Sequence, residues 1–225
     1  MTTRISSYPR HKAFCTAFLI LSVFGFAWGE PDAPPVPRLA SAPDTSTWTI
    51  QYQYLQTDPY PKTSNPIDAQ IYEKMRKAYP RLETVQVTKA ANKRKEVDQY
   101  ADKSESTNWI VGDILLTDTR VYHAVNITNS KLSGINYKND FYNLDWINKA
   151  AYKGRQKFQG IDCYVYGADA ADGSGAQTAY VDAQTNLPFV IQNAQATLTY
   201  TFQSSSETVE LPPDMARHLE DFQRP

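Results

Sequence analysis

The amino-acid sequence predicts a mainly β protein of the α+β class, built on one large curved antiparallel sheet or half-open β-barrel. Roughly ten short runs alternate apolar and polar residues with a period of two, which is typical of strands with one buried face. Tight turns separate most of these runs, and one long amphipathic helix interrupts them. A sheet of that size normally curls, so we expect the helix to lie across its concave face.

Residues 1–29 have the pattern of an export signal. A basic head that includes Arg4, Arg10 and Lys12 precedes an apolar run, and the small residues of Ala27-Trp28-Gly29 follow it. The run is shorter than the roughly 20 residues that a membrane-spanning helix needs. We therefore expect cleavage before residue 30 and export of the mature protein, with a retained membrane anchor as the alternative.

Residues 30–47 are rich in Pro, Ala and Ser and predict a flexible linker, because they offer little apolar area to bury. The folded domain is predicted over residues 48–213. Its first strand begins at Trp48, where apolar residues alternate with polar ones as far as Tyr54.

The long helix is predicted from Asn65 to Ala78. Asn65 is a favourable N-cap, and Pro66 suits the first helical position because its missing N–H has no partner there. Ile71 and Met75 lie one turn apart on an apolar face, while charged residues occupy the opposite face. This pattern indicates a helix that packs on an apolar surface.

The period of two returns after the helix and continues almost to the C-terminus. The segment 131–151 has no clear period and fits either a helical turn or a packed loop. The remaining runs predict strands at 82–89, 93–100, 108–117 with a break at Gly112-Asp113, 121–127, 152–158, 161–166, 178–182, 189–193 and 197–202.

Apolar residues with a common alternation predict one continuous inner surface, which is either a filled core or a ligand cavity, since both demand the same pattern. Aromatic residues and one histidine within it would orient a polar head group at the mouth. The predicted ligand-binding residues are Trp48, Ile50, Tyr52, Ile71, Met75, Val85, Val87, Trp109, Val111, Val121, His123, Val125, Tyr200 and Phe202.

Two charged or amphipathic segments indicate contacts with partners. Lys89, Lys93, Arg94 and Lys95 cluster near a hairpin tip, which is typical of a solvated turn and would also suit an anionic membrane surface. Residues 214–225 predict a short helical tail that docks either on its own sheet or on an envelope protein. The formal net charge of −1 gives no indication of nucleic-acid binding.

The residue types available for catalysis or metal binding are few. Cys163 lies in a strand pattern, where a buried and inert thiol is the common outcome. A thiol-dependent hydrolase that uses Cys163 with His123 is the enzymatic alternative. No Cys and His spacing matches a zinc site, so we expect no metal or cofactor.

The run Tyr180-Val181-Asp182-Ala183-Gln184-Thr185-Asn186-Leu187-Pro188 resembles the aromatic-x-Asp-x-x-Thr-x-x-Pro pattern of periplasmic lipoprotein carriers, the LolA/LolB-like family. The strand pair at 152–166 and the Leu-Pro ending at 211–213 are also similar to that family. The resemblance implies a half-open antiparallel barrel with an apolar cavity for acyl chains or other lipids. The chain departs from the family in having one long helix where the carriers have several.

These observations predict an exported, non-enzymatic protein that holds a lipid, an acylated protein or another hydrophobic ligand. The alternative is an extracytoplasmic interaction or sensor module whose inner surface is filled by its own side chains. The sequence pattern leaves both open.

Overall fold

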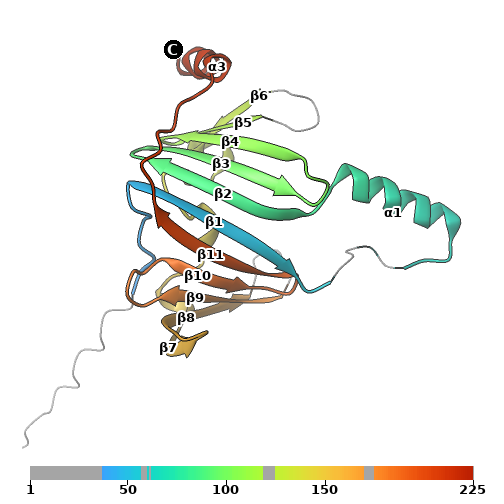
Figure 1. Ribbon diagram of the computed structural model, residues 1–225, viewed down its shortest axis with the longest axis horizontal. Coiled ribbons are helices and arrows are strands. Elements are labelled where there is room, and N and C mark those ends of the chain that lie inside the picture. The colour runs from blue at the N-terminus through green and yellow to red at the C-terminus, as the bar shows by residue number, and fades with distance from the viewer. Residues whose placement is uncertain (1–36, 57–59, 61, 119–124, 170–174, 225) are drawn as a thin grey trace, which may run out of the picture. The chain divides into compact units, whose positions relative to one another are not determined.

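The computed structural model describes residues 37–56, 60, 62–118, 125–169 and 175–224. Within them, eleven strands form one curved, unclosed sheet in which every neighbouring pair is antiparallel (Figure 1). This confirms the predicted half-open antiparallel architecture. The elements are β1 (Thr45–Tyr54), α1 (Pro66–Ala78), β2 (Leu82–Ala90), β3 (Lys93–Tyr100), β4 (Glu105–Val111), β5 (Ile114–Asp118), β6 (Val125–Asn129), α2 (Ser130–Ser133), η1 (Tyr142–Leu144), η2 (Lys149–Ala151), β7 (Tyr152–Phe158), β8 (Ile161–Asp169), β9 (Ala176–Asp182), β10 (Pro188–Gln192), β11 (Ala196–Ser204) and α3 (Pro213–Gln223).

The strand order is β6-β5-β4-β3-β2-β1-β11-β10-β9-β8-β7. The chain thus starts in the middle of the sheet, builds outward to β6, and restarts at the opposite edge with β7. Residues 130–151 make this connection and contain α2, η1 and η2; we call them the crossing segment. The last strand, β11, returns to the centre and pairs with β1.

The two faces of the sheet are covered by different elements. On the inner face, Trp48, Val87 and Tyr200 pack with Phe141 and Leu144 of the crossing segment. On the outer face, Met215 and Leu219 of α3 pack against strands β4 and β5; the buried members of this cluster are Trp109, Ile114, Leu116, Val209, Met215 and Leu219. The predicted C-terminal helix therefore docks on its own sheet.

The N-terminal cap of α1 forms as its sequence predicts. The Oδ1 atom of Asn65 accepts a hydrogen bond from the Ile67 backbone N–H at 3.0 Å, and Pro66 occupies the first turn. The expected position across the concave face is wrong, because none of the residues of α1 is buried. Ile71 and Met75 are 47% and 38% exposed, and the crossing segment occupies the inner face instead.

Residues 37–44, which the sequence assigns to a flexible linker, contact the folded domain. The Ala40 N–H donates to the Asn186 carbonyl at 2.8 Å, and the Tyr166 hydroxyl donates to the Pro37 carbonyl at 2.7 Å. Ala42 is buried in the inner core. Residues 37–44 thus pack on the domain, and β1 begins three residues before the expected Trp48. The predicted signal, residues 1–29, lies outside the described residues.

The motif that carries the family resemblance forms a compact turn between β9 and β10. Asp182 accepts hydrogen bonds from the Gln184 N–H at 2.8 Å and from the Thr185 hydroxyl at 3.1 Å. Asn186 has a φ of +58°, a left-handed conformation that Asn tolerates better than most residues. Pro188 then starts β10. The spacing of Asp, Thr and Pro is therefore explained by turn chemistry.

Candidate ligand pocket

Three central strands supply the apolar floor of a pocket on the inner face. Alternation along β1 places Trp48, Ile50 and Tyr52 on the same side of the sheet. Trp48 pairs with Val87 and Ile50 with Val85 on β2, while Ile50 also pairs with Tyr200 on β11. Because paired residues share a face, these six side chains meet in one patch.

The crossing segment covers part of this floor with aromatic side chains. The Phe141 ring lies 5.7 Å from the Trp48 ring, 6.5 Å from the Tyr200 ring and 6.0 Å from the Phe202 ring, measured between centroids. Tilted and edge-on pairs at these distances are favourable. Phe141 therefore covers part of the inner face over β1 and β11.

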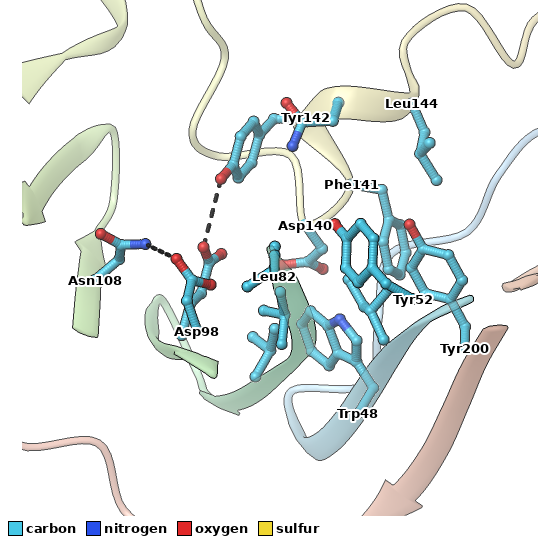
Figure 2. Close-up of a pocket in the computed structure, with 15 residues that line it drawn as sticks. Trp48, Tyr52, Leu82, Asp98, Asn108, Asp140, Phe141, Tyr142, Leu144 and Tyr200 are labelled. Carbon is cyan, nitrogen blue, oxygen red and sulfur yellow. Dashed lines mark hydrogen bonds between the residues drawn. The ribbon is translucent and has the colours of Figure 1, made fainter. Parts of the chain in front are cut away.

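A cavity of about 200 Å³ remains beside Phe141 (Figure 2). Apolar and aromatic groups from the sheet form one side, and the crossing segment forms the other. The lining residues are Trp48, Ile50, Tyr52, Leu82, Val85, Val87, Glu96, Asp98, Asn108, Asp140, Phe141, Tyr142, Asn143, Leu144 and Tyr200. The inner face is thus neither fully packed nor widely open.

One wall of the pocket is acidic. Glu96 and Asp98 of β3 pair with Val87 and Val85 of β2, so that their carboxylates share the inner face with the apolar floor. Glu96 is buried and accepts a hydrogen bond from the Tyr142 hydroxyl at 3.4 Å. Asp98 accepts hydrogen bonds from Ser106 at 3.2 Å and Asn108 at 3.5 Å, as Figure 2 shows for Asn108.

Burial changes the protonation of these groups. Burial raises the pKa of Glu96 to about 7, the Arg94 guanidinium opposes this rise, and the Asp98 carboxylate adds to it. Burial likewise raises the pKa of Asp98 above its ordinary value. The pKa of Tyr52 rises to about 12, through burial first and then through Tyr54 and the two carboxylates. The pocket therefore changes its charge near neutral pH.

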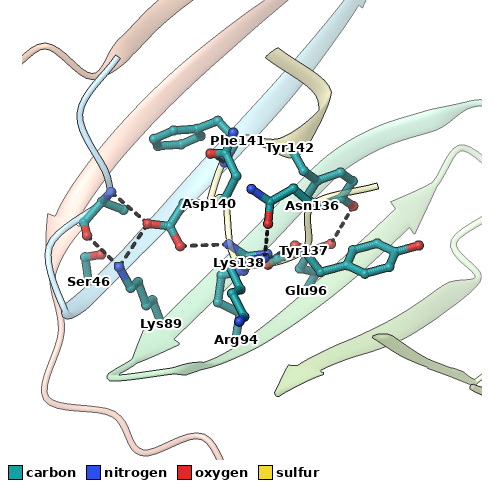
Figure 3. A network of polar contacts seen from close by, with 12 residues as sticks. Ser46, Lys89, Arg94, Glu96, Asn136, Tyr137, Lys138, Asp140, Phe141 and Tyr142 are labelled. Carbon is teal, nitrogen blue, oxygen red and sulfur yellow. Dashed lines mark hydrogen bonds and ion pairs between the residues drawn. The ribbon is translucent and has the colours of Figure 1, made fainter. Parts of the chain in front are cut away.

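A buried ionic cluster holds the crossing segment against the sheet (Figure 3). Asp140 lies 2.9 Å from the Lys89 Nζ atom and 2.7 Å from the Arg94 Nη1 atom. It also accepts the Ala42 N–H at 3.0 Å, while the Arg94 Nη2 atom donates to the Tyr137 carbonyl at 2.8 Å. Asp140 therefore joins the N-terminal segment, the hairpin and the crossing segment at one point.

The same cluster corrects the interpretation of the basic hairpin. Lys89 and Arg94 are buried on the inner face and paired with Asp140, so they cannot contact a membrane surface. Lys93 and Lys95 lie on β3 with the opposite alternation to Arg94. The four residues therefore do not form one basic surface, because alternate strand residues point to opposite faces.

The predicted ligand-binding residues fall into five groups. Trp48, Ile50, Tyr52, Val85, Val87 and Tyr200 line the pocket. Phe202 packs in the adjoining core, against Trp48 and Phe141. The expectation that Trp109, Val111 and Val125 share this face is wrong, because they pack in the outer cluster with α3. Ile71 and Met75 lie on the exposed face of α1, and Val121 and His123 lie outside the described residues.

Sequence reasoning missed the acidic wall and the aromatic cover. Glu96 and Asp98 are separated by Val97, and the pattern indicates a solvated strand with Val97 as its apolar side. The register of the hairpin could have revealed the acidic wall, because it places Glu96 and Asp98 opposite the inward-facing Val87 and Val85. Phe141 and Tyr142 lie in an aperiodic segment, so alternation could not place them.

Cys163 is a buried free thiol on β8, and burial raises its pKa. A high thiol pKa opposes formation of the reactive thiolate. Its predicted partner His123 lies outside the described residues. Among the residues that the structure describes, no group of three or more metal-ligating side chains is placed to hold an ion, and no helix is long and apolar enough to span a membrane.

No family model matches the chain, and no curated protein matches it. The solved structures that are similar to it include the following three. The first is an uncharacterized conserved protein from Thermus thermophilus, with 11% sequence identity, a TM-score of 0.45, and coverage of 76% of this chain and 88% of that chain. The second is the lipoprotein LppX from Mycobacterium tuberculosis, with 12% identity, a TM-score of 0.38, and coverage of 75% of this chain and 90% of that chain. The third is the LolA superfamily protein NE2245 from Nitrosomonas europaea, with 11% identity, a TM-score of 0.32, and coverage of 78% of this chain and 91% of that chain.

Proposed function

We propose that this chain is an exported, periplasmic binding protein without enzymatic activity, and that it holds a ligand with a hydrophobic body between the sheet and the crossing segment. The observation that carries the proposal is the inner pocket, whose floor is Trp48, Tyr52 and Tyr200. A concave site with apolar walls and a few convergent polar groups is the usual form of a small-molecule site.

The volume of the pocket limits the ligand. Sites for drug-sized ligands measure about 300–1,000 Å³, whereas this cavity measures about 200 Å³. A small guest fits the pocket as it stands. A long acyl chain of a lipid or lipoprotein fits only if Phe141 and Leu144 move off the sheet, because they occupy the adjoining part of the inner face.

Tryptophan fluorescence tests this function, because Trp48 lies in the pocket and Trp109 lies on the outer face. We expect a saturable change on titration with short alkyl ligands. A Trp109→Phe variant should keep the change, and a Val85→Phe variant, which fills the cavity, should lose it. If no ligand gives a saturable response with folded protein, the binding function is wrong and the interaction module with a filled inner face is favoured.

A further inference from the structure

The charges around the pocket are unevenly compensated. The two buried cations, Lys89 and Arg94, are directed to acids outside the acidic wall: Asp140 binds both, and Asp44 lies 3.5 Å from Lys89. Asp140 is the closest anion to both cations, and Arg94 lies farther from Glu96, with 3.9 Å between its Nε atom and Glu96 Oε1. Glu96 and Asp98 are then two further carboxylates that face the same cavity.

Glu96 is only weakly engaged by its neighbours. Its one cationic neighbour among the described residues is Arg94, whose Nε atom lies 3.9 Å from Glu96 Oε1, too far for a hydrogen bond. That buried Nε atom makes no hydrogen bond in the described structure. The bond from the Tyr142 hydroxyl is long, at 3.4 Å. A buried carboxylate normally has close donors, so this site has unused capacity to accept hydrogen bonds.

The remaining walls suit a cation that carries a short apolar chain. Trp48, Tyr52 and Tyr142 line the cavity together with Glu96. Aromatic faces attract ammonium groups, and the attraction is stronger when water is excluded. Leu82 and Val85 provide the apolar part of the lining next to the carboxylates.

We propose that the ligand is a small amphiphilic amine, whose ammonium group donates to Glu96 and Asp98 while its apolar body rests on Trp48 and Tyr52. This inference rests on the proposed binding function and adds the chemical class of the ligand. It differs from the sequence-based expectation of a lipid or acyl chain, for which an anionic head would meet the two carboxylates unfavourably.

Isothermal titration calorimetry with three ligands of equal chain length tests the proposal: n-hexylamine, n-hexanol and hexanoate. With the purified protein at pH 8, we expect hexylamine to bind about tenfold or more tightly than hexanol, since hydrogen bonds to ionised groups are the stronger ones. Hexanoate should bind most weakly.

Two variants connect that preference to the acidic wall. Glu96→Gln keeps the shape of the side chain and removes its charge, so hexylamine should lose about tenfold in affinity while hexanol is unchanged. Asp98→Asn should also lower the affinity for hexylamine. The matched control is Glu83→Gln, whose side chain on β2 is half-exposed and paired with Lys103. It should leave all three affinities unchanged.

The affinity for hexylamine should also rise about tenfold from pH 5.5 to pH 8, because Glu96 loses its proton over this range while an alkylamine keeps its own. The charged and titratable groups that face Glu96 are Arg94 and Asp98 on β3, Tyr52 on β1, and Asp140 and Tyr142 on the crossing segment. Hexanol should show no such dependence.

The outcomes separate the two proposals. Equal or tighter binding of hexanol or hexanoate, unaffected by Glu96→Gln, overturns the amine assignment and leaves the binding function intact. No binding of any of the three ligands, with a folded protein by circular dichroism, overturns both. An amine preference that Glu96→Gln abolishes and Glu83→Gln preserves supports the assignment.

Discussion

A single carboxyl group, that of Glu96, makes the stability of this protein depend on pH. Its pKa rises from 4.5 to about 7 on folding, so the folded state binds more protons than the unfolded state between these values. The contribution of Glu96 to the free energy of unfolding therefore falls as the pH rises from about 4.5 through 7. This pH dependence is opposite to that of a carboxyl group in a strong ion pair, which stabilises the folded state more as the pH rises.

The Glu96→Gln substitution should remove this loss of stability at high pH. At pH 8 we expect the variant to be more stable than the original protein, by at most about 3 kcal/mol, and at pH 5 the two should be nearly equal. Urea unfolding at both pH values measures the difference. The Glu83→Gln control should follow the original protein at each pH, and a Glu96→Gln variant without a pH-dependent gain would contradict the burial of this carboxylate.

Asp140 stabilises the molecule in a different way, by compensating two buried cations. In Asp140→Asn, Lys89 and Arg94 lose their closest anion. Removing one partner of a buried ionic cluster costs about 3–5 kcal/mol. We expect a loss of that size in urea unfolding. Asp145→Asn, at an exposed position of the same segment, should cost less than about 1 kcal/mol.

At the level of elements, the crossing segment covers the inner face of the sheet, where the sequence predicts α1. Helical periodicity made α1 predictable as a helix, yet it gave no information about the surface beneath it. The crossing segment has no period, although Phe141, Leu144 and Ile147 are all buried on the inner face. Packing partners far apart in sequence decide such placements, and one sequence does not reveal them.

The exposure of α1 gives a direct test. Ile71→Lys should change the free energy of unfolding by less than about 0.5 kcal/mol, because Ile71 is 47% exposed. Leu144→Ala, in the crossing segment, should cost about 2–5 kcal/mol because Leu144 is buried in the inner core. Thermal unfolding of both variants makes the comparison. A large fall for Ile71→Lys would mean that α1 packs on the sheet.

The C-terminal helix α3 should behave as an integral part of the fold. Met215 is 2% exposed and packs with Trp109 and Leu116, so Met215→Ala should cost about 2–5 kcal/mol. The exposed neighbour His218 serves as the control, and His218→Ala should be nearly neutral. Thermal unfolding, with the fluorescence of Trp109 as a local probe, distinguishes them. Unchanged stability in Met215→Ala would leave α3 available to another protein.

For the whole molecule, alternation predicted the antiparallel sheet and six of the residues around the pocket. It failed where both faces of a strand are apolar. In β4, Trp109, Ile110 and Val111 are consecutive, so the period of two does not say which of them point inward. Register shows that Ile110 pairs with the inward-facing Arg94, which places Trp109 on the outer face.

The strand β1 lies at the centre of the sheet, and its two hydrogen-bonding edges are filled by strands from different parts of the chain. Trp48 pairs on one side with Val87, close in sequence, and on the other with Phe202, near the C-terminus. During synthesis, β1 therefore keeps one open hydrogen-bonding edge until the chain has been made as far as β11. A product truncated before residue 196 would lack β11 and present that edge permanently, which makes it prone to aggregation by strand pairing.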